Sequence, residues 1–155
     1  MTYRITGLSS AAFAPLFALD DAGLASLNAR RVRAEADRGF PCRVSLVDAA
    51  QGESLILLHH VSHDVATPFR AAYAIHVREQ ARESAVHVDV PPPVFAGRTL
   101  SLRGFDAQGM LRDARLAWPG EVDAAIRALF ESGAIAYIHS HYAAPGCFAA
   151  RIDRS

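Results

Sequence analysis

Apolar and polar residues alternate over much of the chain after residue 42, and this alternation limits the possible folds more than any other feature. A period of two is typical of β-strands that bury one face. Two turn-like segments that end in glycine, at residues 48–52 and 106–109, separate such runs, so we expect antiparallel hairpins there. The predicted strands span residues 43–47, 54–63, 71–78, 85–90, 99–105 and 110–118.

Helical patterns lie on either side of this region. Ser9 or Ser10 can cap a helix that runs to Leu19, and the two aspartates that follow can cap a second helix. We expect the second helix to end near the arginines at residues 30–33, which suits the negative end of its dipole. Further along the chain, apolar residues at helical spacing predict a third helix over residues 122–130.

A last hairpin is predicted after the third helix, with strands at residues 135–142 and 147–153. A chain of 155 residues has the usual size of one domain and is expected to bury about 68–70% of the surface of its unfolded form. We therefore predict a single α+β domain over residues 1–155. Its sheet should be mainly antiparallel, with two N-terminal helices and one helix before the C-terminal hairpin.

The composition excludes several classes of protein. Sixteen basic residues balance sixteen acidic ones and neither sign forms a long run, so we expect no nucleic-acid partner. All the basic residues are arginine, which excludes enzymes that need a Schiff-base or P-loop lysine. No stretch approaches the ~20 apolar residues that span a bilayer, so we expect no membrane partner. Cys42 and Cys147 are too few and too far apart for a disulfide framework, which predicts a cytoplasmic protein.

The C-terminal hairpin carries the candidate catalytic residues. His139 and His141 project from the same face of an extended strand, and the turn at residues 143–146 should bring Cys147 close to His141. A thiol beside an imidazole can act as a nucleophile. The alternative is that these three side chains only pack or form hydrogen bonds within the sheet.

Two histidines at this spacing can also share a metal ion. A zinc site needs three or four protein ligands, and no second His-x-His, HExxH or paired CxxC motif supplies the others. The sequence also lacks the glycine-rich fingerprint of dinucleotide-binding proteins. We therefore expect neither a bound metal nor a cofactor.

Two arginines that follow prolines are candidates for ligand binding. Arg43 comes after Pro41, and Arg70 comes after Pro68. A guanidinium that points into a pocket can bind a carboxylate or a phosphate through two parallel hydrogen bonds, whereas one at the surface forms ordinary ion pairs. His63, at the end of a predicted strand, is the third candidate for ligand binding.

Three stretches of the chain resemble a bacterial family called domain of unknown function 1203. They are RGFPCRVSLVDAAQGESLILL at residues 38–58, TPFRAAYAIHVRE at 67–79 and YIHSHYAAPGCFAARIDR at 137–154. The resemblance implies a stand-alone bacterial domain, and it implies no activity because the family has none established. His76 stands where the family pattern has an aromatic residue, so the resemblance gives it no shared role. The recognisable motifs fall at Pro41, Cys42, Arg43, Pro68, Phe69, Arg70, His139, His141, Gly146 and Cys147.

Two hypotheses for the function remain open. In the first, the C-terminal hairpin and an arginine bind a small anionic molecule, with or without catalysis. In the second, the protein is a non-catalytic domain that forms a homodimer through a face or an edge of its sheet. A concave pocket that contains the candidate side chains favours the first hypothesis, and dispersed side chains with a large apolar contact favour the second.

Overall fold

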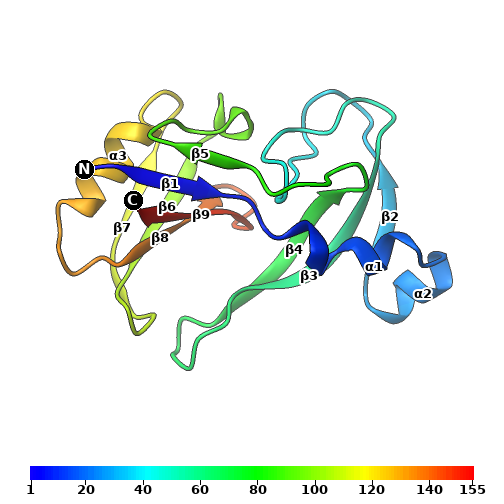
Figure 1. The fold of residues 1–155 in the computed structure, drawn as a ribbon, viewed down its shortest axis with the longest axis horizontal. Helices are drawn as coiled ribbons and strands as arrows, with labels where there is room; N and C mark the ends of the chain where they lie inside the picture. Colours follow the sequence, from blue (N-terminus) through cyan, green and yellow to red (C-terminus); the bar gives the residue numbers. More distant parts are fainter.

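The structure, a computed structural model, describes all 155 residues and contains nine β-strands. The strands are β1 (Tyr3–Thr6), β2 (Arg30–Arg33), β3 (Ser54–His63), β4 (Ala71–Arg78), β5 (Val86–Val88), β6 (Leu100–Phe105), β7 (Leu111–Ala117), β8 (Tyr137–Tyr142) and β9 (Phe148–Arg154). They form a six-stranded sheet in the order β5-β1-β9-β8-β6-β7 and a three-stranded sheet in the order β2-β3-β4 (Figure 1). All the strand pairs are antiparallel, which confirms the predicted α+β class.

Three short α-helices accompany the sheets: α1 (Ala14–Phe17), α2 (Asp21–Ser26) and α3 (Val122–Phe130). As predicted, two of them are N-terminal and one precedes the last hairpin. The first predicted helix is interrupted, because a 3₁₀ turn at Ser10–Ala12 precedes α1. Asp20 caps α2 by accepting a hydrogen bond of 2.8 Å from a backbone N–H of its first turn. None of the helices combines the length and the apolarity needed to cross a bilayer.

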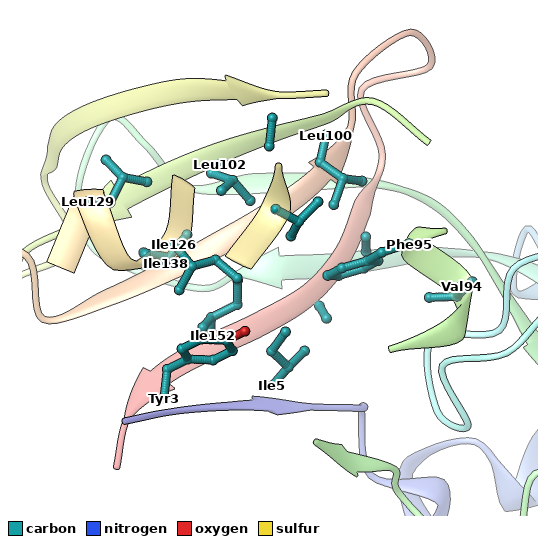
Figure 2. Close-up of a cluster of buried hydrophobic side chains, with 14 of the residues drawn as sticks. Tyr3, Ile5, Val94, Phe95, Leu100, Leu102, Ile126, Leu129, Ile138 and Ile152 are labelled. Carbon is teal, nitrogen blue, oxygen red and sulfur yellow. The ribbon is translucent and has the colours of Figure 1, made fainter. Parts of the chain in front are cut away.

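Helix α3 covers one face of the six-stranded sheet and builds the main core with it. Ile126 and Leu129 of the helix lie in one cluster with Leu102 of β6 and Ile138 of β8 (Figure 2). These side chains are almost completely buried, and burial of a side chain of this size contributes about 1.5–3 kcal/mol. The opposite face of the sheet carries Tyr137, whose hydroxyl contacts the end of β3 in the smaller sheet. The two sheets therefore meet on the side away from α3.

Most of the predicted strands are confirmed. Strands β3 and β4 have the predicted bounds, and β6 to β9 differ from the predicted bounds by a residue or two at their ends. The turn at residues 106–109 joins β6 and β7 in a hairpin, as expected. These elements are defined by local alternation and by glycine turns, which is why the sequence alone predicts them.

The strand predicted at residues 43–47 is wrong. The segment forms a compact turn, in which the N–H of Leu46 donates to the carbonyl oxygen of Cys42 and Leu46 has a φ of 52°. Val44 and Leu46 are both fully buried, but in two different clusters. Their alternation comes from a chain that passes between two cores and not from strand pairing. The turn at residues 48–52 therefore leads into β3 and does not close a hairpin between two strands.

The prediction that the arginines at residues 30–33 end a helix is also wrong. They form β2, an edge strand of the smaller sheet. Helix α2 stops at Ser26, and Asn28 then turns the chain with a φ of 55°, which asparagine tolerates better than most residues. Arg31 on this strand reaches Glu79 in an ion pair of 2.8 Å.

Gly7, just after β1, tests the close packing between the end of this strand and the turn at residues 43–47. An added Cβ at this position would overlap the backbone carbonyl of Val44, a residue that is itself fully buried. We predict that Gly7→Ala lowers the free energy of unfolding by at least about 2 kcal/mol, because overpacking forces the backbone to shift. Urea denaturation measures this change. Gly133→Ala is the control, since an added Cβ there meets nothing within 4 Å, and an equal effect of the two substitutions would contradict the packing.

Candidate functional site

A fully buried arginine lies between the turn at residues 43–47 and the β8–β9 hairpin. Arg43 is only 2% exposed, and its guanidinium donates from Nε to the carbonyl oxygen of Phe148 at 2.8 Å and from Nη1 to that of Pro41. Nη2 donates to the Sγ of Cys147 at 3.1 Å. No carboxylate lies within ion-pair distance of this guanidinium. An unbalanced buried charge is costly, so Arg43 is the most unusual charged group of the molecule.

Arg43 lines a cavity of about 490 Å³, which we call the first cavity. It lies between the smaller sheet and the turn at residues 143–146. Tyr142 forms part of its wall, and two guanidiniums lie over the tyrosine ring, that of Arg43 at 5.0 Å and that of Arg98 at 5.5 Å from the ring centre. Burial raises the pKa of Tyr142 to about 12, and its hydroxyl has no hydrogen-bond partner in the protein.

The other titratable groups of this wall leave the charge of Arg43 unbalanced. Arg98 is already paired with Asp48 through two hydrogen bonds of 2.8 and 2.7 Å. Burial by itself raises the pKa of Asp48, but the bonds and the charge of Arg98 outweigh it and hold this pKa below its usual value. Burial, aided by the charge of Arg43, lowers the pKa of His76 to about 4, so this imidazole is neutral near pH 7.

Cys147 lines the first cavity and forms no hydrogen bond with the histidines of the hairpin. Its sulfur accepts a hydrogen bond from Arg43, and none joins it to His139 or His141. The reason is a bulge in the β8–β9 hairpin, where the register shifts by one residue between Ser140 and His141. The extra residue places Cys147 on the opposite face of the hairpin from His141. The expected contact between the thiol and an imidazole is therefore absent.

His141 lines a second cavity, of about 290 Å³, on the other side of the turn. Its Nδ1 donates to the carbonyl oxygen of Gly146 at 2.9 Å, because a carbonyl can only accept. Burial lowers the pKa of His141 to about 4, so the ring is neutral near pH 7 and its Nε2 is an acceptor. Arg103 of β6 lines the same cavity, and burial lowers the pKa of its guanidinium.

His139 and His63 line neither cavity and pack together in an aromatic cluster, with ring centres 4.8 Å apart. His63 donates from Nδ1 to the carbonyl oxygen of Phe69, and its Nε2 accepts the hydroxyl proton of Tyr137, both at 2.8 Å. Burial lowers the pKa of His139 to about 3, and its Nδ1 has no hydrogen-bond partner. These contacts join the end of β3 to β8, and the catalytic role of His139 and the ligand-binding role of His63 stay predictions.

Arg70 lies outside both cavities. Its exposed side chain forms an ion pair of 3.0 Å with Asp64, in the connection between β3 and β4. No group of three or more His, Cys, Asp or Glu side chains is arranged to hold a metal ion. The structure thus brings Arg43 and Cys147 together, places His141 in the neighbouring cavity and leaves Arg70 at the surface.

Sequence reasoning missed Tyr142, Arg98 and Arg103, and it set His76 aside. Tyr142 directly follows the His-x-His motif, so its position next to the site was visible in the sequence. No local signal marks the two arginines. They reach the cavities because β6 pairs with β8, a contact between segments far apart along the chain.

His139 makes the stability of the fold depend on pH. Its pKa is about 3 in the folded protein against 6.5 for the free side chain, so between these values the unfolded chain binds the proton more readily. Its contribution to stability is therefore complete above pH 6.5 and is lost on acidification, by at most about 1.4 kcal/mol per pH unit. We predict that His139→Phe, which keeps a ring in the cluster, flattens this loss in urea denaturation below pH 6.5. A variant with the wild-type slope would contradict a buried, neutral imidazole.

A family model described as "Protein of unknown function (DUF1203)" matches residues 39–154. This span includes Arg43, Arg103 and the whole C-terminal hairpin, and it leaves out β1, β2 and the first two helices. No curated protein and no solved structure matches the chain. The match covers most of the chain and confirms the resemblance found in the sequence, so the chain belongs to the DUF1203 family of proteins of unknown function.

Proposed function

We propose that this protein binds a small molecule through an anionic group, and that Arg43 holds this group in the first cavity. The observation that carries the proposal is the burial of Arg43 with no carboxylate beside it. Removing a guanidinium from water costs several kcal/mol unless an opposite charge balances it. An anion bound in the first cavity supplies that balance.

Arg43 has hydrogen-bonding capacity left for such a group. A guanidinium has five N–H donors. The Nε, Nη1 and Nη2 atoms each make one hydrogen bond within the protein, which leaves one N–H on each terminal nitrogen. A carboxylate can bind such a pair of N–H groups with both of its oxygens.

The charges of the wall favour a carboxylate over a polyphosphate. Arg43 is the one guanidinium of the first cavity without a carboxylate partner, because Arg98 is paired with Asp48. His76 adds no positive charge near pH 7, since burial lowers its pKa to about 4. A group with a single negative charge therefore balances the wall, whereas a polyphosphate would carry charge that nothing here neutralises.

The other residues that line the first cavity indicate the chemistry of the rest of the ligand. Pro41, Ala143, Ala144 and Pro145 give it an apolar lining. Tyr142 is neutral near pH 7 because its pKa is about 12, so it adds no negative charge to the wall of the cavity. The class that fits is a small carboxylic acid with an apolar body.

The proposal concerns binding. Catalysis by His139, His141 and Cys147 stays a prediction, and the separation of the thiol from both imidazoles favours a binding site over a Cys–His nucleophile.

The alternative of a homodimer has weaker support. Val86 and Val88 are exposed on β5 and Leu116 is exposed on β7, and these strands are the two opposite edges of the six-stranded sheet. A stable dimer buries one continuous surface, so the cavity carries the proposal.

Protection of Cys147 from a thiol reagent tests the proposal directly. Cys147 lies beside Arg43 and is 8% exposed, so an acid bound on Arg43 should shield it. Cys42 is the internal reference, because it is fully buried in another cluster. We predict that butyrate or benzoate slows the labelling of Cys147 in a saturable way, measured by mass spectrometry for each cysteine. The reagent should label Cys42 more slowly than Cys147 at every concentration of acid.

The matched variants are Arg43→Gln, Arg43→Lys and Arg70→Gln. Arg43→Gln should abolish the protection, and Arg43→Lys, which keeps the charge but loses the planar fork, should weaken it by about tenfold. Arg70→Gln should leave it unchanged, because Arg70 lies outside both cavities. Circular dichroism checks that each variant is folded. Protection that persists in a folded Arg43 variant, or no protection of the wild-type protein by either acid, would refute the proposal.

A further inference from the structure

We infer that the ligand carries two anionic groups and that Arg103, in the second cavity, binds the second of them while Arg43 binds the first. This inference rests on the proposed function and narrows its ligand class to short dicarboxylic acids. It comes from the distribution of ion pairs among the arginines and from the way in which the two cavities adjoin.

Only two arginines of the chain are sheltered from solvent without a carboxylate partner. The arginines at positions 31, 70, 78, 98, 112, 115, 127 and 151 form ion pairs. Those at positions 4, 30, 33, 38, 82 and 154 are exposed, so water solvates their charge. The remaining two are Arg43, which is buried, and Arg103, which is partly buried and whose side chain makes no hydrogen bond to the protein. Each of them lines one of the two cavities.

The two cavities lie on either side of one residue. Pro145, in the turn between β8 and β9, is the one residue that lines both. The charges of Arg43 and Arg103 both act on the imidazole of His141, where they lower its pKa in addition to the effect of burial. The geometry that links the two guanidiniums is Pro145, because it borders both cavities, and a molecule that passes Pro145 can reach one guanidinium from each.

The neutral state of His141 suits a ligand with two charges. A protonated imidazole would add a third positive charge beside the two guanidiniums, but the pKa of His141 is about 4. Its Nδ1–H is held by the carbonyl oxygen of Gly146, which leaves Nε2 as an acceptor. Two carboxylates therefore balance the two guanidiniums, and Nε2 can accept a hydrogen bond from a hydroxyl or N–H on the chain between them.

Titration with length-matched acids tests the inference. Malonate, succinate, glutarate and adipate are compared with propionate, butyrate, valerate and hexanoate by calorimetry at constant ionic strength, because salt screens charge–charge attraction. For at least one chain length we expect the wild-type protein to bind one dicarboxylate per chain, at least about tenfold more tightly than its monocarboxylate partner, as a charge-assisted hydrogen bond provides.

Arg103→Gln should bring this ratio close to one without changing the affinity for the monocarboxylate. Arg103→Lys should retain part of the preference because it keeps the charge. Arg82→Gln, which removes an exposed arginine without an ion pair, is the control and should leave the ratio unchanged. Two outcomes would overturn this inference alone, provided that monocarboxylates still bind through Arg43. One is that no dicarboxylate is preferred at any chain length, and the other is that the preference survives Arg103→Gln. Acids that bind without any need for Arg43 would overturn the proposed function as well.

Discussion

A guanidinium buried without a carboxylate is the interaction on which the rest of this molecule depends. Placing Arg43 out of water costs several kcal/mol. The carbonyl oxygens of Pro41 and Phe148 and the ring of Tyr142 offset part of this cost by facing the charge with electron density. Pro41 is close to Arg43 along the chain, whereas Tyr142 and Phe148 both belong to the β8–β9 hairpin, so the three groups surround the charge only when the segment at residues 41–43 packs against that hairpin. Arg43 thus joins these two segments, and the proposed anion would balance its charge.

The bulge in the β8–β9 hairpin determines the chemistry of each cavity. A regular hairpin would place Cys147 on the same face as His141, as the alternation of the sequence implies. One extra residue reverses the faces from His141 onward, so the thiol enters the first cavity beside Arg43 while the imidazole enters the second. The same short turn thereby separates a cavity with a buried guanidinium from one with a neutral imidazole and a partly buried arginine.

Much of the fold could be predicted from the sequence, because alternation and glycine turns are local signals. They place β3 and β4 at their observed bounds. These local signals could not predict the turn at residues 43–47. Val44 and Leu46 are buried in two separate cores, so the segment has the alternation that is typical of a strand. Within the candidate site, Arg43 and Cys147 could be identified from their sequence motifs. The contact between them could not be predicted, because it depends on the bulge in the β8–β9 hairpin. Arg103 carries no signal at all, since only the pairing of β6 with β8 brings it to the site.

A crystal structure of the protein with bound 4-bromobenzoate would test the role of Arg43 most directly, because anomalous scattering from bromine locates the acid without ambiguity. The expected result is one acid in the first cavity, with its carboxylate oxygens about 2.7–3.2 Å from the two terminal nitrogens of Arg43. A carboxylate bound away from Arg43, or a protein carboxylate found beside its guanidinium, would contradict the view that this buried charge awaits an anionic ligand.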